Sequence, residues 1–285
     1  MVKVLIPIPL QDSDPSEVAV TWQVLSGEGH EIVFATPDGT PAKGDELMIT
    51  GDGLDFWAGV PVIKHLKVMG SILRANKDAR SAYNSMITRP EFVNPIKWED
   101  IEVSTFDAIF LPGGHRARGM RDYLESPILK SKVGEFFAAN KSVGAICHGV
   151  LLVARSESPE TGKSVLFGWK TTALTWTLEN AAWSIANWTR FWDPNYYRTY
   201  MEEAGQPAGY MSVQQEVTRA LEKPEDFKDV EKGDPNFRKK SSGMSRDSLT
   251  DDSPAFVYRD RNYLSARWPG DVFTFAKSFA AMLKE

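Results

Sequence analysis

The stretch SVGAICHGVLLVA, residues 142–154, decides the fold class of this chain. Its first five residues form a short apolar run typical of a buried strand, and the residues after His148 are apolar over a length that suits a helix. The small residues Ala145 and Gly149 lie on either side of the junction. We therefore predict a sharp strand-to-helix turn with Cys147 at its tip, which is the geometry of a nucleophile elbow.

Strands and helices alternate along the rest of the chain. Strands are predicted at residues 2–6, 31–35, 106–111 and 142–146, and helices at 18–26 and 127–139. The chain closes with two short strands in AFVYRDRNYLSAR, residues 255–267, joined by a turn at 260–262, and with a helix at 271–283. This alternation predicts an α/β fold with a mostly parallel sheet covered by helices on both faces.

Two segments do not follow the alternation. Residues 40–104 hold glycine-rich turns and a stretch with helical spacing from Trp57 to Met86. Residues 177–253 begin helical and aromatic and become polar, without apolar periodicity, toward their end. We predict a single domain over residues 1–285 in which both segments are insertions, the second of them partly a mobile surface loop.

Composition narrows the classes of function. The formal net charge of −5 argues against a broad footprint for nucleic acid or anionic lipid. No run approaches the roughly 20 apolar residues that cross a bilayer, and the opening MVKVLIPIPL reads as a strand rather than as a leader. The single cysteine fits a reducing compartment. We expect a cytoplasmic protein with a small-molecule ligand and with neither a nucleic-acid nor a membrane partner.

Cys147 is the first candidate for chemistry. A thiol at the N-terminus of a helix is close to backbone N–H groups and to the positive end of the helix dipole, so we predict a pKa below about 8.5. The alternative is a buried structural cysteine, because free cysteine is among the most buried residue types.

Three further features lie at the same predicted sheet edge. In LPGGH, residues 111–115, two glycine N–H groups follow a strand and are placed to form an oxyanion hole, or else only a tight turn. His148 follows Cys147 directly and is a candidate general acid and base, or else a capping histidine. Glu17 follows the first strand, where most glutamates are only helix N-terminal charges.

Taken together and in this order, these residues resemble the ThiJ/PfpI superfamily. The matching pieces are the opening strand with Glu17, FDAIFLPGGH, the AICHG elbow, and the closing strand pair with its helix, about half of the chain. The resemblance implies a flavodoxin-like three-layer sandwich of the class I glutamine-amidotransferase-like type, here with helical insertions. It also implies a homodimer.

The resemblance also implies roles for individual residues. Cys147 would be a nucleophile or redox-sensitive thiol, and Glu17 would hydrogen-bond its sulfur. A histidine directly after the cysteine, with large insertions, is similar to the chaperone and glyoxalase III branch, in which a downstream acid completes a Cys-His-acid triad. Glu179 is the best candidate for that acid. The alternatives are Glu157, Glu160 and Asp193.

Two departures from known patterns limit the resemblance. Arg116 follows His115 where that branch often has glycine, which affects the expected shape and polarity of the pocket. No histidine follows His148, whereas true glutamine amidotransferases of this fold need one well downstream of the cysteine. Glutamine hydrolysis is therefore not expected.

The leading hypothesis is a glyoxalase III-like conversion of methylglyoxal to lactate. Cys147 would attack the aldehyde, and His148, held by Glu179, would move a proton between the two carbons. The N–H groups of Gly113 and Gly114 would stabilise the enediolate oxygen, with His115 beside the substrate. No phosphate loop and no clustered metal ligands occur in the sequence, so we expect neither cofactor nor metal.

Two alternatives stay open. The first is a cysteine hydrolase or hydratase acting on an amide, peptide or isonitrile, with the aromatic insertion covering a larger apolar substrate, unless those aromatics only pack into the core. They are Trp176, Trp183, Trp188, Trp192, Tyr196 and Tyr197. The second is a stress chaperone or redox sensor without turnover, with an exposed apolar patch at residues 57–70.

Overall fold

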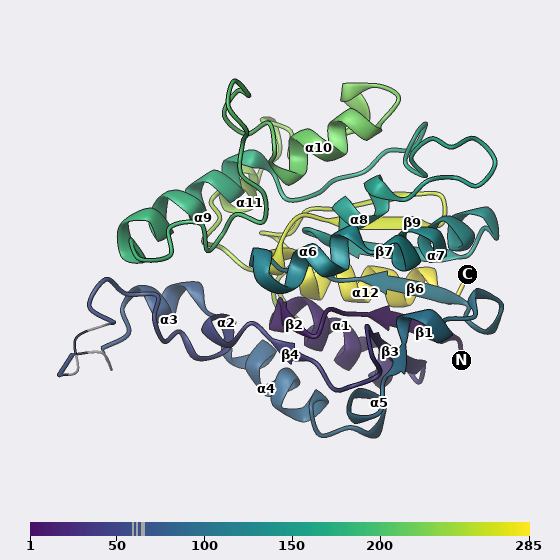
Figure 1. Cartoon of the computed structure of the whole chain (residues 1–285), viewed down its shortest axis with the longest axis horizontal. Coiled ribbons are helices and arrows are strands. Elements are labelled where there is room, and N and C mark those ends of the chain that lie inside the picture. Colours follow the sequence, from purple (N-terminus) through teal and green to yellow (C-terminus); the bar gives the residue numbers. More distant parts are fainter. Residues whose placement is uncertain (59, 61, 64–65) are drawn as a thin grey trace.

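A seven-stranded sheet forms the centre of the computed structural model, which describes residues 1–58, 60, 62–63 and 66–285 (Figure 1). Across the sheet the strands are β5 (Ile96–Lys97), β3 (Glu31–Thr36), β1 (Lys3–Pro7), β6 (Ala108–Leu111), β7 (Ser142–Ile146), β9 (Tyr263–Ala266) and β8 (Val257–Asp260). Neighbouring strands are parallel except β8, which is antiparallel to β9. A separate small parallel pair is formed by β2 (Gln11–Ser13) and β4 (Lys43–Gly44).

Helices pack on the sheet in two groups. The first group is α1 (Pro15–Gly27), which contacts α4 (Lys77–Met86) and α12 (Val272–Met282). The second is α8 (Gly149–Arg155), which contacts α6 (Ala117–Glu125), α7 (Pro127–Ala138) and α10 (Val213–Ala220). The predicted α/β, flavodoxin-like class is confirmed. The strand predicted at residues 142–146 has those bounds in the structure.

Local sequence explains why the first helix begins where it does. Asp14 caps α1, and its Oδ1 accepts hydrogen bonds from the backbone N–H groups of Ser16 (2.8 Å) and Glu17 (3.1 Å). Pro15 at the first helical position has no N–H to leave unsatisfied. This cap holds Glu17 in the first turn, at the end of β1 where the sheet meets the elbow.

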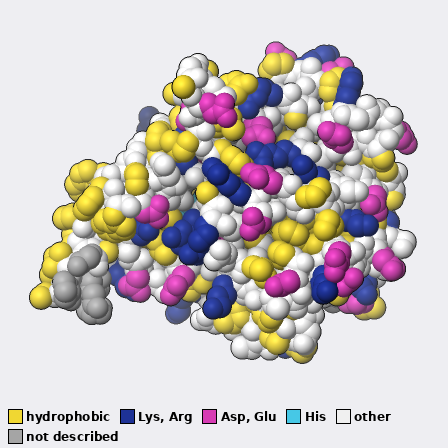
Figure 2. Space-filling view, in the orientation of Figure 1, with side chains coloured by type: hydrophobic (Ala, Val, Ile, Leu, Met, Phe, Trp, Pro, Cys, Tyr) yellow, Lys and Arg dark blue, Asp and Glu magenta, His cyan; other side chains and the backbone are white. Residues whose placement is uncertain are grey.

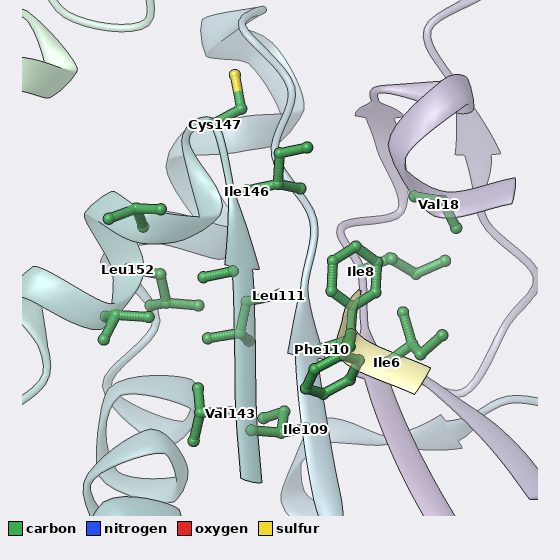
Figure 3. Packing of buried hydrophobic residues seen from close by; sticks show 14 of the residues in the cluster. Ile6, Ile8, Val18, Ile109, Phe110, Leu111, Val143, Ile146, Cys147 and Leu152 are labelled. Carbon is green, nitrogen blue, oxygen red and sulfur yellow. The ribbon is translucent and has the colours of Figure 1, made fainter. Parts of the chain in front are cut away.

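The core lies directly beneath the elbow. Figure 3 shows Ile6, Phe110 and Val143 among the side chains packed around β1, β6 and β7, with Cys147 beyond them at the end of β7. Its sulfur points away from this packing. Cys147 is 5% exposed and belongs to the edge of this core, which therefore supports the turn from below.

The segment at residues 40–104 is more closely tied to the fold than an insertion would be. It supplies the edge strand β5 and the helix α4, which packs on α1. The predicted helical stretch becomes α3 (Met69–Leu73) and α4, because Asn76 begins a new helix by accepting a hydrogen bond from the N–H of Ala79. Two short helices, α2 (Glu46–Thr50) and α5 (Pro90–Val93), complete the segment.

The segment at residues 177–253 stays outside the central sheet. It carries α9 (Trp176–Thr189), α10 and α11 (Phe237–Ser241), and α9 and α3 lie at the same end of the molecule (Figure 1). Toward its end, residues 231–253 are exposed or half-buried except Asp247, as expected for a surface segment. Asp247 is 2% exposed and accepts hydrogen bonds from the N–H groups of Phe273 (3.2 Å) and Thr274 (2.6 Å) at the start of α12. Hydrogen bonds of this kind hold the segment against the rest of the fold, although its sequence has no apolar periodicity.

The apolar patch expected at residues 57–70 falls partly on Gly59, Pro61, Lys64 and His65, which lie outside the described residues. Among its described members, Val62, Leu66 and Val68 are exposed. Figure 2 shows hydrophobic side chains gathered at this end of the visible face, whereas basic and acidic side chains are interspersed over the rest. No helix in the described residues combines the length and apolar character needed to cross a bilayer.

Candidate active site

Cys147 occupies the tip of a strained turn. Its φ is +56°, in the left-handed region that non-glycine residues seldom adopt, which costs on the order of 1–3 kcal/mol. The turn is held from the neighbouring strand, where the carbonyl of Ala266 accepts a hydrogen bond from the Cys147 N–H (3.1 Å). Helix α8 then begins at Gly149, where a side chain would overlap the carbonyl oxygen of Leu111. The structure thus contains the strand-to-helix turn that the sequence predicts.

Glu17 is fully buried beside the cysteine. Its Oε2 accepts a hydrogen bond from the Gly113 N–H (2.7 Å), so the loop after β6 is fastened to the first turn of α1. Burial raises the pKa of Glu17 well above its ordinary value, and the nearby charge of Asp14 raises it further. The Gly113 N–H and the nearby Cys147 thiol lower the pKa but do not reverse the shift. Glu17 Oε1 has no hydrogen-bond partner among the described residues, so the expected hydrogen bond between Glu17 and the Cys147 sulfur stays a prediction.

The pKa of the Cys147 thiol is raised, contrary to the prediction from the helix terminus. Burial is the largest cause, and the negative charges of Glu17 and Asp14 add to it. The backbone N–H of His148 lowers the pKa, but by less. The sequence argument counted only this last effect, because neither the burial nor the two carboxyl groups can be read from residues 142–154.

Titration of the thiol tests this balance. A raised pKa leaves Cys147 protonated at neutral pH, so thiolate absorbance in the ultraviolet should appear only well above pH 8.5, and at higher pH in the folded than in the denatured chain. The Glu17→Gln variant removes one of the negative charges and should shift the midpoint to lower pH. Cys147→Ser provides the blank, since the chain has no other thiol. A folded-state midpoint below that of the denatured chain would contradict the assigned direction.

His148 lies against the sulfur as a neutral imidazole. Its Nδ1 is 3.4 Å from the Cys147 Sγ, and the residue is 1% exposed. Burial lowers its pKa to about 3. The charge of His115, when that ring is protonated, and the positive charge of Arg155 contribute to this lowering. The side chain makes no capping hydrogen bond to α8. A neutral ring next to a protonated thiol is placed to accept the thiol proton.

The two glycines of the predicted oxyanion hole are not equivalent. The Gly113 N–H is already used by Glu17, whereas the Gly114 N–H donates to no other described residue. A side chain at Gly114 would meet the Asp12 carbonyl oxygen and the Met120 sulfur, so close packing requires glycine there. The His148 N–H is directed at the sulfur and is a donor beside the reacting atom. Gly114 is not among the residues that line the cavity, so its role in an oxyanion hole stays a prediction.

His115, the last residue of LPGGH, lies within a cluster of aromatic and acidic side chains. Its ring is 4.7 Å from that of Tyr196 and 4.4 Å from that of Tyr197, and its Nε2 is 3.6 Å from Asp45 Oδ2. Burial lowers its pKa to about 4, which leaves it neutral near pH 7. His115 therefore brings a neutral polar ring to the site.

Glu179 lines the same cavity but contacts other groups than expected. Its Oε1 forms a 3.0 Å ion pair with the fully buried Arg198, and its Oε2 accepts a hydrogen bond from the Val213 N–H (3.1 Å). Burial raises its pKa to about 7, against the opposing effect of Arg198. Among the described residues Glu179 makes no hydrogen bond to His148, so its role in holding the imidazole stays a hypothesis.

The alternative acids do not line the cavity. Glu157 and Glu160 are exposed, and Asp193 is paired with Arg190 at 2.7 Å. Glu179 is thus the member of the predicted set that shares a cavity with Cys147.

The cavity in front of Cys147 has a volume of about 290 Å³. One part of its lining is polar and comprises Asp14, His115, Cys147, Glu179, Tyr197 and Arg246. Aliphatic and aromatic side chains supply most of the rest, among them Met48, Ile72, Leu73, Leu174, Leu178, Ile185, Met244 and Trp268. Most of these come from α2, α3, α9 and the loop after α11, so both sequence segments outside the strand–helix alternation contribute to the walls, whereas Leu174 precedes α9 and Trp268 follows β9.

Comparison with known proteins identifies the family. A family model described as ThiJ/PfpI family-like matches residues 8–208, which include the elbow and most of the cavity-lining residues. The chain belongs to the ThiJ/PfpI-like family. A curated relative of this ThiJ/PfpI-like protein, an uncharacterised protein of Schizosaccharomyces pombe, is 24% identical over 162 residues. That match spans 54% of this chain and 54% of the relative, about half of each.

Solved structures support the fold of the ThiJ/PfpI-like chain. Glyoxalase III from Candida albicans is 18% identical with a TM-score of 0.55, and the match covers 99% of this chain and 97% of that one. Rapid Encystment Protein of Francisella tularensis is 16% identical with a TM-score of 0.58 and 99% coverage of both chains. A ThiJ/PfpI domain protein of Brachyspira murdochii is 12% identical with a TM-score of 0.52, covering 99% of this chain and 96% of that one.

The predicted aromatic insertion of this ThiJ/PfpI-like protein divides into three pairs. Tyr196 and Tyr197 are buried and pack on His115, whereas Trp188 and Trp192 are exposed. Trp176 and Trp183 each lie 5.0 Å from the Arg198 guanidinium. The insertion therefore contributes to the site mainly through the tyrosines and through the aliphatic face of α9.

Sequence reasoning missed two polar residues of the site. Asp14 could have been found, since DPSE before a predicted helix is a capping signal. Arg246 could not have been found, because it lies in a polar stretch whose sequence has no periodicity from which the position of a side chain could be predicted.

Proposed function

We propose that this protein converts 2-oxoaldehydes such as methylglyoxal to 2-hydroxy acids, without a cofactor, through Cys147. One observation supports this more than any other. A thiol held at a strained turn faces a cavity, and a neutral imidazole nitrogen lies 3.4 Å from its sulfur. Nucleophile, proton acceptor and substrate space are therefore contiguous.

The reaction would begin with addition of the Cys147 sulfur to the aldehyde carbon. As the carbon–sulfur bond forms, His148 accepts the thiol proton and passes it to the aldehyde oxygen, giving a hemithioacetal. The N–H groups of Gly114 and His148 would stabilise the developing oxyanion, since Gly113 is occupied by Glu17.

An internal proton transfer would follow. His148 removes the proton from the former aldehyde carbon and passes it to the adjacent ketone oxygen, which gives an enediol. The enediol then loses the hydroxyl proton of the sulfur-bearing carbon through His148 and takes a proton at the second carbon, which gives a thioester with no net change in protons. The first carbon is oxidised and the second is reduced, so no external oxidant is needed. Water attacks the thioester, the carbon–sulfur bond breaks, and the 2-hydroxy acid leaves with Cys147 again a thiol.

A product assay tests the proposal directly. Purified protein with methylglyoxal and a metal chelator, without added nucleotide, should form one lactate for each methylglyoxal consumed. The rate should rise with pH above neutrality, because the raised pKa of Cys147 limits thiolate at low pH. Loss of methylglyoxal without lactate, or lactate only at the rate seen in buffer, would rule the proposal out.

The size of the cavity favours a second candidate with the same nucleophile. About 290 Å³ is roughly twenty times the space that one water needs, far more than methylglyoxal fills. A hydrolase or hydratase acting on a larger apolar amide, peptide or isonitrile would use Cys147 and the apolar walls together. Turnover of such compounds, with none of methylglyoxal, would favour this candidate.

A further inference from the structure

Arg246 is a cationic residue in a mostly apolar cavity. It follows α11 and lines the same space as Cys147, with its guanidinium 5.7 Å from the Trp268 ring. Its one hydrogen bond within the described residues goes from Nη2 to the carbonyl oxygen of Leu73 (2.9 Å). No carboxylate of those residues lies within ion-pair distance of it.

A half-buried cation that pairs with no described carboxylate is only partly satisfied by the protein. The guanidinium keeps its charge and presents five N–H donors, of which one hydrogen bond uses a single N–H. Burial lowers the pKa of Arg246, and the distant charge of Asp14 offsets this only in part. Asp14 already accepts two backbone hydrogen bonds as the cap of α1. The remaining donors are thus available to a bound anion.

The walls beside Arg246 fit an aliphatic chain. Leu73 comes from α3, Leu178 and Ile185 come from α9, and Met244 precedes Arg246 in the same loop. These side chains offer dispersion contacts and no hydrogen bonds, so they favour hydrocarbon over a polar ligand. The cavity therefore joins a cation, an aliphatic surface and the thiol of Cys147, and its lining also holds the carboxyl groups of Asp14 and Glu179. Both carboxyl groups have other partners, since Asp14 caps α1 and Glu179 pairs with Arg198, so neither pairs with Arg246.

We propose that the cavity binds an elongated apolar carbonyl compound that carries a carboxylate, and that Arg246 selects it by binding the carboxylate. The hydrocarbon part lies against α3 and α9, and the carbonyl group reaches Cys147. The carbonyl part of this proposal rests on the proposed function; the anion part does not.

Calorimetric binding of octanoate and of 1-octanol to the unmodified protein tests the anion part, because the two probes share a chain length and differ in charge. Octanoate should bind at least roughly tenfold more tightly. In Arg246→Gln this preference should disappear while the affinity for octanol is kept, and Arg246→Lys should restore part of it. Neither probe is a 2-oxoaldehyde, so the result is independent of methylglyoxal turnover.

Arg238→Gln is the matched control, since Arg238 is an exposed arginine of the same segment that does not line the cavity. It should retain the full preference for octanoate. Equal affinity for the two probes in the unmodified protein would overturn the proposal, as would an Arg246→Gln variant that still prefers octanoate. Should Arg246→Gln fail to fold, Arg246→Lys takes its place and should show a smaller preference for octanoate than Arg238→Gln does. An Arg246→Lys variant whose preference equals that of Arg238→Gln, or a preference in the unmodified protein that is undiminished in 1 M salt, would overturn the proposed ionic contact.

Discussion

Replacement of Cys147 by serine is expected to lower kcat/KM for methylglyoxal by roughly a thousandfold or more. The substitution keeps the size of the side chain and the N–H groups around it, but a hydroxyl is a far weaker acid and nucleophile than a thiol. The chain has no other cysteine to take over. Steady-state lactate formation, measured with the folded variant, checks the prediction.

Ser156→Ala is a suitable control for this variant. Ser156 is fully buried directly after α8, and its hydroxyl donates to the Leu152 carbonyl (2.8 Å) away from the cavity. Its loss changes a buried side chain on the elbow's helix without touching the site, so kcat/KM should stay within a few-fold of the original. A Cys147→Ser variant that retains a tenth of the activity would mean that the thiol is not the nucleophile.

Replacement of Gly149 by alanine is expected to destabilise the fold by about 3–5 kcal/mol. The new methyl group would overlap the Leu111 carbonyl oxygen and lie 2.9 Å from the Pro112 carbonyl oxygen. Both obstacles are backbone atoms, one at the end of β6 and one in the loop that carries Gly113, so neither can move aside as a flexible side chain does. The free energy of unfolding in urea, from the midpoint and slope of the transition, gives the comparison.

Gly27→Ala provides the contrast. Gly27 ends α1, and a methyl group there would meet no atom within 4 Å. Its stability should change by less than about 1 kcal/mol, because only backbone entropy and helix propensity are altered. A Gly149→Ala protein as stable as Gly27→Ala would show that the loop after β6 can yield, and that the elbow is held less tightly than its contacts indicate.

Much of the framework was predictable because it depends on local sequence. A strand buried on both faces must be apolar over its buried length, and residues 143–146 and 108–111 are. The second strand begins at Ala108 rather than at the predicted residue 106, because the exposed Asp107 precedes it. A helix must carry apolar residues at its own period and begin at a suitable cap. The turn at Cys147 could be placed for the same reason, since a close approach between strand and helix requires small residues such as Gly149.

The chemistry of the site was less predictable because it depends on contacts between distant residues. The local argument for Cys147 predicted a lowered pKa, yet Glu17 and Asp14, more than a hundred residues away, and burial by the whole fold raise it. Likewise, Gly113 N–H was expected to be free and binds Glu17, and Glu179 was expected beside His148 and pairs with Arg198.

The sequence by itself therefore determined the α/β framework, the elbow and the identity of its nucleophile candidate, since each follows from residue size and apolar period over a few neighbouring positions. Only the tertiary structure decided the charge state of the site and the lining of its cavity, including Arg246. Burial and charge pairing depend on residues that folding brings together from the whole chain, so they cannot be predicted from any short stretch of sequence.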